Sequence, residues 1–352
     1  MILEEFLTDL NERLDVENES RYRAHWKEFL NNRCGDEVFE PPFRAPNPPS
    51  VEWPEIHIND AIDDIDLMIL TELKQISDVI SAGGNTALCV RSNYGCSILP
   101  SLFGCDLYTM PRRMDSLPTS IPLHELSKIK GLLDSGVPDL NSGQGAMVFD
   151  TGHRFRELFD RYENIASCVG LYHPDLQGPV DVAELVWGSE LYFGFIDEPE
   201  IMHQLLDLIC ETYLEVLRRW FQIAPPTPEC APHWSVMHTG SVMLRNDTLN
   251  NLSPEIYDEF VRPYDQKVFD EFDGGAIHFC GRGDHYISSM AEMRGLTALN
   301  VAQPELNDMK TIYENSVDVG IKLLALESSV AGSSDRPLRG QVQCYHNGLC
   351  DN

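Results

Sequence analysis

The sequence predicts an α/β protein whose main body is a (β/α)8 TIM barrel, preceded by an N-terminal helical extension. The chain has 352 residues, which is ample for a barrel of about 250 residues with insertions. Short apolar segments of strand character alternate with segments of helical periodicity through most of the chain. Such repeated β-then-α units favour a parallel sheet covered by helices, for which an open doubly wound sheet is the alternative.

The extension is assigned to residues 1–59. Apolar residues recur at helical spacing through residues 1–33, which predicts helix there. Residues 41–54 contain six prolines, so they are expected to lie over the domain as an irregular arm.

The barrel is assigned to residues 60–328, and it opens with a helix over residues 60–82. The remaining residues, 329–352, form a polar, glycine-containing tail that is expected to pack loosely. Strands are predicted within residues 86–93, 165–172, 235–247, 274–281, 296–303 and 321–328, with a loop or a polar exit at the end of the first and third of these ranges.

The composition restricts the class of partner. With 26 basic and 56 acidic residues the formal net charge is −30, so nucleic acid and acidic membrane surfaces are poor partners. No segment reaches the roughly 18 apolar residues of a membrane span, and the ten cysteines lack the spacing of a disulfide scaffold. We therefore expect a cytoplasmic protein that acts on a small molecule.

Polar side chains follow the apolar strands, at the end of a parallel barrel where active sites lie. Asp247 follows one predicted strand and is a candidate general base, or an orienting partner of Arg245. Arg91 and Arg245 would attract an anionic group, whereas Arg282 and Arg339 more simply form surface ion pairs. The substrate-binding candidates are Arg91, Tyr94, Gln177, Arg245, Asn300 and Gln303.

The most specific local pattern is His278-Phe279-Cys280. Residues i and i+2 of a strand point to the same face, so the imidazole and the thiol converge. An imidazole and a thiolate are natural zinc ligands, although a buried pair without metal is the alternative. Of the third ligands considered, Glu327 ranks first because it ends a strand; the others are His285, Cys344, His346 and Cys350.

Four stretches together resemble the uroporphyrinogen decarboxylase superfamily, on the branch that includes cobamide-dependent methyltransferases. His278 to Gly281 is similar to its HxCG element, and the other three stretches follow the family's order over roughly residues 85–328. They are Asn93-Tyr94-Gly95 with Ser101 to Gly104, Asp175 to Pro179, and Leu252 to Tyr264.

This resemblance implies a (β/α)8 barrel in which the histidine and cysteine of HxCG bind zinc, here His278 and Cys280. In that branch a further cysteine after the last strand completes the ligand set, but the matching position lies near Ser328, where no cysteine stands. The zinc holds and activates a thiol, and the methyl group comes from a corrinoid on a separate protein. The arginine-rich N-terminal motif of true uroporphyrinogen decarboxylases is absent.

These residues and the resemblance leave three candidate functions. A zinc-dependent methyltransferase acting on a small-molecule thiol comes first. A cofactor-free decarboxylase (a lyase) would use the arginines to bind carboxylates and an aspartate such as Asp247 to stabilise a cationic ring. A catalytically silent binding barrel would lack polar residues at the strand ends, and they are present here.

Overall fold

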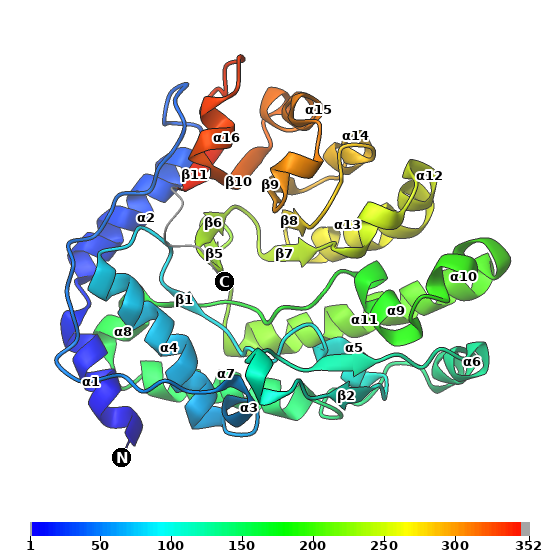
Figure 1. Ribbon diagram of the computed structural model, residues 1–352, viewed down its shortest axis with the longest axis horizontal. Helices are drawn as coiled ribbons and strands as arrows, with labels where there is room; N and C mark the ends of the chain where they lie inside the picture. The colour runs from blue at the N-terminus through cyan, green and yellow to red at the C-terminus, as the bar shows by residue number, and fades with distance from the viewer. Residues whose placement is uncertain (1, 346–352) are drawn as a thin grey trace.

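The most regular part of the molecule is a five-stranded parallel sheet. The computed structural model describes residues 2–345, and Figure 1 shows this sheet with helices packed around it. Each strand pairs with the next along the chain, so the strand order follows the sequence order. The strands are β7 (Val242–Arg245), β8 (Gly275–Phe279), β9 (Leu296–Val301), β10 (Lys322–Glu327) and β11 (Val342–Tyr345).

The preceding part of the chain has shorter and less regular strands. β1 (Cys89–Val90) pairs in parallel with β4 (Gly170–Leu171). Two antiparallel hairpins complete the set: β2 (Asp106–Tyr108) with β3 (Thr119–Ile121), and β5 (Ala231–His233) with β6 (Val236–His238). The β5–β6 hairpin lies in the middle of the molecule, between β1 and the large sheet (Figure 1).

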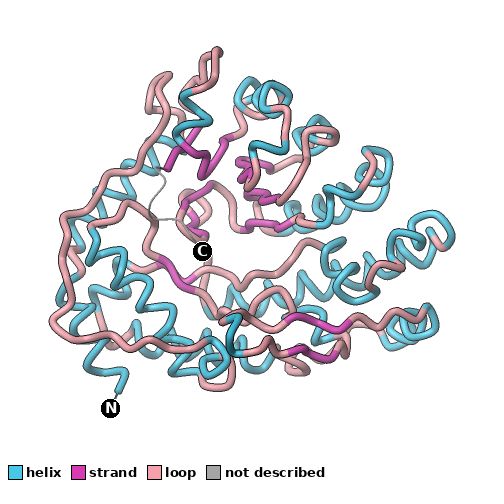
Figure 2. The backbone as a smooth tube through the Cα atoms, viewed as in Figure 1, coloured by secondary structure: helices cyan, strands magenta, loops and turns pink. Residues whose placement is uncertain are grey.

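Helices form the outer layer around these strands (Figure 2). The longest, α11 (Pro199–Ile223), begins with a proline at its first position and buries one apolar face. The helices before it are α1 (Ile2–Arg13), α2 (Val16–Leu30), α3 (Ile58–Ala61), α4 (Ile65–Ala82), α5 (Ile98–Leu102), α6 (Leu126–Ser135), α7 (Gly145–Phe159), α8 (Glu163–Cys168), α9 (Pro179–Trp187) and α10 (Leu191–Asp197). Those after it are α12 (Pro254–Ile256), α13 (Arg262–Glu271), α14 (Ile287–Ala291), α15 (Met309–Glu314) and α16 (Ser328–Gly332), with a π-helical stretch at Tyr257–Val261 between α12 and α13.

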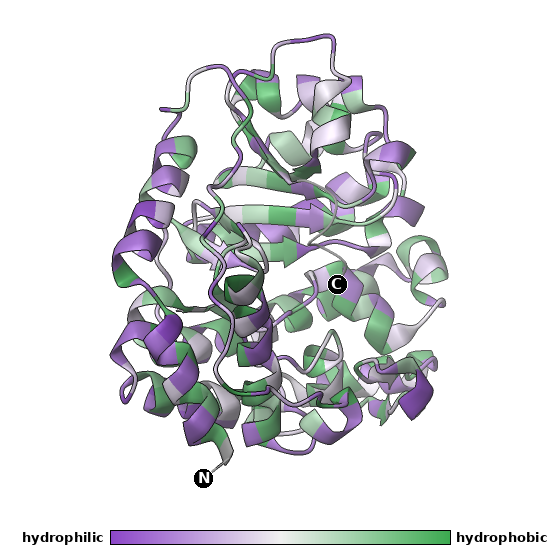
Figure 3. Ribbon diagram, turned by 60° about the vertical axis from the view of Figure 1, so that its left-hand side comes forward, coloured by the Kyte–Doolittle hydropathy of each residue, from purple (hydrophilic) through white to green (hydrophobic). Residues whose placement is uncertain are grey.

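The N-terminal extension is packed against the rest of the chain. Leu7 and Leu10 of α1 are fully buried in a cluster with apolar residues of α4. Trp26 and Phe29 of α2 are also fully buried, and they share a cluster with strand residues such as Met243. Hydrophilic residues concentrate on the outer faces of the peripheral helices, as Figure 3 shows.

The predicted α/β architecture with a parallel sheet is present, but a closed barrel is not seen in the strand pairing of residues 2–345. Other contacts join the two groups of strands: the Gly178 amide donates to the Arg245 carbonyl at 2.6 Å, and the Met243 amide donates to the His173 ring at 3.1 Å. Hydrogen bonds from a loop and from a side chain therefore join the two groups of strands, where a barrel would have regular strand pairing.

Two local predictions were wrong. Residues 165–172 were expected as one strand, but α8 extends to Cys168 and only Gly170–Leu171 pair as strand. The tail was expected to pack loosely, but β11 forms the edge of the sheet and Val342 is fully buried. A bridge between Phe39 and Gln343 joins this strand to the extension. No helix among residues 2–345 is long and apolar enough to cross a membrane.

Candidate metal centre

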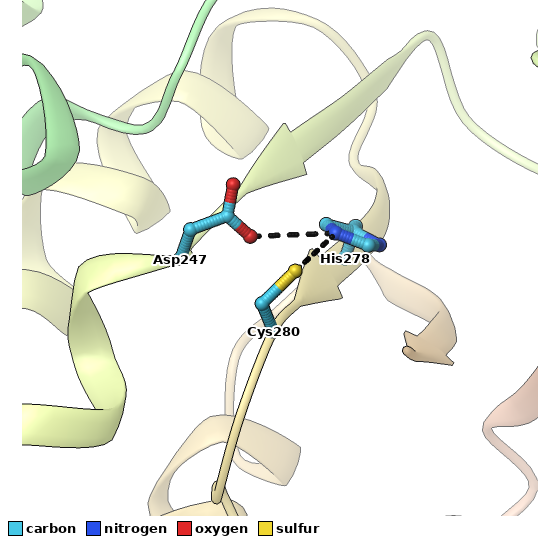
Figure 4. A group of neighbouring side chains, drawn as sticks. All are labelled: Asp247, His278 and Cys280. Carbon is cyan, nitrogen blue, oxygen red and sulfur yellow. Dashed lines mark hydrogen bonds and ion pairs between the residues drawn. The ribbon is translucent and has the colours of Figure 1, made fainter. Parts of the chain in front are cut away.

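Asp247, His278 and Cys280 come together at the carboxyl ends of β7 and β8. His278 Nε2 lies 3.3 Å from Asp247 Oδ1 and 3.4 Å from Cys280 Sγ, as Figure 4 shows. The three ligand atoms all lie within 4.8 Å of one another. The strand register explains this, because Arg245 of β7 pairs with His278 of β8. Asp247 and Cys280 each follow two residues after this pair, so they leave the two neighbouring strands at the same level.

The three donors suit a metal ion in chemistry and in spacing. Tetrahedral zinc, with bonds of about 2.0–2.3 Å to N, O and S, separates its ligand atoms by about 3.3–3.8 Å. Both distances from His278 Nε2 fall in that range. Asp247 Oδ1 is buried without a hydrogen-bond partner among the described residues, so this carboxylate oxygen is left for a cation.

Asn300 fixes the orientation of His278. Its Oδ1 lies 2.6 Å from His278 Nδ1, and its amide donates to the Leu324 carbonyl at 2.9 Å. Because that amide is used as a donor, Asn300 Oδ1 accepts the proton of Nδ1. The Nε2 lone pair is then directed toward Asp247 and Cys280, as a metal ligand requires.

The loops that carry Asp247 and Cys280 are held by buried polar groups. Asp181, at the start of α9, accepts the backbone amides of Asp247 and Thr248 at 2.7 and 2.9 Å. After Cys280, Gly281 has a φ of +74°, and a Cβ there would lie 2.8 Å from the Asn250 side chain, so the turn requires glycine. The Gly281 amide donates to Gln303 Oε1 at 2.6 Å.

The electrostatics of the site favour a bound cation. Burial alone would raise the pKa of Asp247, but the adjacent His278 and Arg245 hold it well below its usual range. Burial and the Asp247 carboxylate raise the pKa of the Cys280 thiol to about 12. A metal ion reverses this second effect, because coordination stabilises the thiolate.

An ion-pair network extends from the donors into the first half of the chain. Asp175, whose side chain is 6% exposed, binds both Arg91 and Arg245 at 3.2 Å. Arg245 also lies 3.5 Å from Asp247, which links the network to the metal donors. Arg245 therefore lies next to a donor and Arg91 is joined to it through Asp175, and each arginine is already paired with a carboxylate of the chain.

Trp234, which the sequence did not single out, also borders the site. It lies at the tip of the β5–β6 hairpin with a φ of +49°. Its ring is 4.9 Å from the His278 ring and 5.1 Å from the Arg245 guanidinium, and its Nε1 donates to Asp175 at 3.5 Å. A non-glycine residue in this backbone region is uncommon and is often found at functional sites.

The other predicted substrate-binding residues divide into two groups. Gln177 reaches the site, because its amide lies 3.4 Å from Asp247 Oδ2. Asn300 and Gln303 are also there, but they bind His278 and the Gly281 backbone. Tyr94 is 1% exposed and its hydroxyl bonds Thr151, so it is buried in the core and its polar group is already paired.

The third ligand expected from the sequence, Glu327, does not join the group. Its carboxylate accepts a hydrogen bond from Ser329 at the end of β10. β10 is two strands away from β8, a separation of roughly 10 Å, whereas β7 with Asp247 is adjacent. Asp247 therefore occupies the place proposed for Glu327.

The remaining alternatives are also placed elsewhere. The His285 ring bonds the Leu252 carbonyl, and Cys344 is buried in β11. Arg282 and Arg339 are exposed and pair with Asp284 and Asp318, respectively. The two other candidate ligands, His346 and Cys350, lie outside the described residues.

Comparisons with known proteins show the fold only. No family model and no curated protein matches this sequence. Among solved structures, the chain is similar to a methyltransferase from Methanosarcina mazei, with a TM-score of 0.63, 15% sequence identity and coverage of 92% of each chain. At this identity the likeness establishes a shared fold.

Proposed function

We propose that this protein is a zinc enzyme that transfers a methyl group to the thiol of a small molecule. The convergence of Asp247, His278 and Cys280 carries the proposal, because these donors match a zinc site with three protein ligands. Such a set leaves one coordination position for a substrate, as in catalytic rather than structural zinc sites.

The chain's own residues have separate roles in this proposal. Asp247, His278 and Cys280 hold the ion, and Asn300 keeps the His278 lone pair directed toward it. When bound, zinc lowers the pKa of a coordinated thiol and presents a thiolate at neutral pH. Trp234 and Gln177 border the donors and would contact the substrate.

The methyl transfer itself is supported by two likenesses. The HxCG-like element and its companion stretches resemble methyltransferases that take the methyl group from a corrinoid on a separate protein. The structurally similar protein from Methanosarcina mazei is named a methyltransferase. The barrel is part of the same proposal, with the five-stranded sheet and the β1–β4 pair as two arcs of its wall.

The cofactor-free decarboxylase is the weaker alternative. That reaction needs arginines free to bind substrate carboxylates, but Asp175 pairs with both Arg91 and Arg245. It also needs a carboxylate free to stabilise a cationic ring, but Asp247 faces His278 and Cys280. A carboxylate substrate would have to displace ion pairs that the chain already makes.

Metal analysis tests the proposal first. We expect about one zinc per chain in the purified protein, lost in Cys280→Ser because a site with two remaining ligands binds weakly. Cys34→Ser is the control and should retain the zinc, because Cys34 is a half-buried cysteine of the N-terminal extension and is not one of the three donors.

Activity then tests the reaction. With methylcobalamin as donor and a panel of small thiols as acceptors, we expect a methyl thioether from the zinc-loaded protein and none from Cys280→Ser. Zinc-free protein after expression in zinc-replete medium would contradict the metal site. A zinc-loaded protein that methylates no thiol would contradict the reaction while leaving the metal site in place.

A further inference from the structure

A cavity of about 230 Å³ lies at the base of the β5–β6 hairpin. It is lined by residues of α2, β4, the end of α11 and the hairpin itself. Ser241, just before β7, belongs to its wall, whereas Asp247 of the metal centre follows β7. The cavity is therefore at the opposite end of this strand from the metal donors.

Arg23 gives this cavity a positive charge without a partner acid. It is half-buried on α2, and one guanidinium nitrogen donates to the Cys168 carbonyl at 2.7 Å. No carboxylate among the described residues lies within 4.0 Å of it, although the chain carries a net charge of −30. The nearby Lys27, in contrast, is paired with Glu229 at the rim.

His238 adds a buried hydrogen-bond acceptor. The residue is 1% exposed and lines the cavity, and its Nδ1 donates to the Thr239 carbonyl at 3.1 Å. No hydrogen bond to its Nε2 occurs in residues 2–345, so this atom is available to a ligand. Burial lowers the pKa of His238 to about 4, which keeps the ring neutral and Nε2 an acceptor.

The rest of the wall is largely apolar. Val169, Leu171, Phe221 and Met237 contribute aliphatic, aromatic and thioether surface. The volume exceeds the roughly 150 Å³ that accommodates benzene and is below the roughly 300 Å³ at which drug-sized pockets begin. A molecule with a single ring therefore fits.

We propose that this cavity is a second binding site, which takes a small single-ring carboxylate carrying a hydroxyl or amine. The carboxylate pairs with Arg23, the hydroxyl or amine donates to His238 Nε2, and the ring packs against Phe221 and Met237. Arg23 is a suitable anchor because guanidinium–carboxylate pairs are bidentate and charge-assisted. This site is independent of the metal centre and of the reaction proposed there.

Calorimetric titration of the full-length protein with the three hydroxybenzoate isomers tests the site. We expect at least one isomer to bind with a stoichiometry of one, and the matching hydroxybenzyl alcohol, which lacks the carboxylate, to bind much more weakly. Arg23→Gln should weaken binding by about 10- to 100-fold, the usual value of a charge-assisted hydrogen bond. Arg21→Gln is the matched control, because Arg21 is exposed on the same helix and does not line the cavity.

A second variant separates binding from folding. Ala166 lines the cavity and is exposed, so Ala166→Phe should block the site without disturbing the core. Unchanged circular dichroism and thermal midpoints would show that both variants fold. The proposal is overturned if no isomer binds at millimolar concentration, or if binding is the same in wild type, Arg23→Gln and Ala166→Phe.

Discussion

The two halves of the chain contribute different kinds of groups to the candidate metal centre. Residues 242–345 form the regular parallel sheet, and they supply Asp247, His278 and Cys280 together with Asn300. Residues 85–241 have short strands and hairpins, and they supply Arg91, Asp175 and Trp234. The candidate donor atoms thus come from the regular half, and the irregular half adds the aspartate that pairs Arg91 with Arg245 and the ring of Trp234.

This difference has a physical reason. Metal ligands must be placed within a few tenths of an ångström, and adjacent hydrogen-bonded strands do this well. Arg245, His278 and Asn300 pair in register across three strands. Ion pairs and aromatic contacts tolerate more variation in distance, so loops and a hairpin can provide them.

The largest expected effect is a difference in zinc affinity between variants of the two aspartates that bind Arg245. Asp247→Asn removes an anionic ligand, so zinc affinity should fall by more than the roughly 10- to 100-fold typical of losing an outer hydrogen-bond partner. Asp175→Asn should keep one zinc per chain, because Asp175 pairs with the two arginines and accepts from Trp234 but is not one of the three donors. The free energy of unfolding of the Asp175→Asn variant should fall by about 3 kcal/mol, since Arg91 and Arg245 lose their shared partner.

Competition titration with a chromogenic zinc chelator and denaturant unfolding measure these two quantities. Equal zinc affinity in the two variants would show that the division between the halves is wrong. It would also indicate that Arg245, which both aspartates contact, controls the site indirectly.

A smaller effect is expected at Asn300, which lies in the regular half and touches the site only through His278. Asn300→Ala should lower zinc affinity by about 10- to 100-fold and leave the stoichiometry at one. Asn315→Ala, at a residue that bonds only a backbone carbonyl of its own helix, is the control. If Asn300→Ala binds zinc as tightly as wild type, the imidazole is oriented by its surroundings instead.

The sequence predicted the regular half more completely than the irregular half. β8, β9 and β10 lie within predicted strands, and His278 with Cys280 was recognised from the i, i+2 spacing. The third donor was misplaced, because sequence alone does not say which strands are neighbours. Once β7 is known to pair with β8, Asp247 follows from the register.

The β5–β6 hairpin could not be predicted from local signals. Its two-residue turn is Trp234-Ser235, without the glycine or asparagine that usually marks such turns. Pro232 within β5 also argues against a strand by the usual rules. Contacts with distant residues hold the turn instead: the Cys89 thiol donates to the Trp234 carbonyl, and the Ala87 amide to the Ser235 carbonyl.

A further prediction tests whether those contacts hold Trp234 in a strained conformation. Both Trp234→Ala and Trp234→Gly remove the ring and its contacts with His278 and Arg245. Only glycine relieves the backbone at a φ of +49°, so the glycine variant should be more stable than the alanine variant by about 1 kcal/mol. Denaturant unfolding measures the difference; an alanine variant at least as stable as the glycine variant would rule out strain at this turn.

The last expected effect concerns the pH dependence of stability and Asp265, a fully buried residue of α13 behind the regular sheet. Burial raises the pKa of its carboxyl from an ordinary value of 3.8 to about 7, although Asn246 donates a hydrogen bond to it at 2.7 Å. The folded state favours the protonated carboxyl. The contribution of Asp265 to the free energy of unfolding is therefore fully present below about pH 4 and is lost as the pH rises through about 7. Asp265→Asn should therefore flatten the decline in the free energy of unfolding between about pH 4 and pH 7, whereas Asp270→Asn, on the exposed side of the same helix, should not. Urea unfolding at several pH values gives these slopes, and identical slopes in wild type and Asp265→Asn would mean that Asp265 is ionised throughout. In that case the regular half would carry a fully buried negative charge besides Asp247, and Asn246, which precedes Asp247 in the chain, would stabilise it as a hydrogen-bond donor.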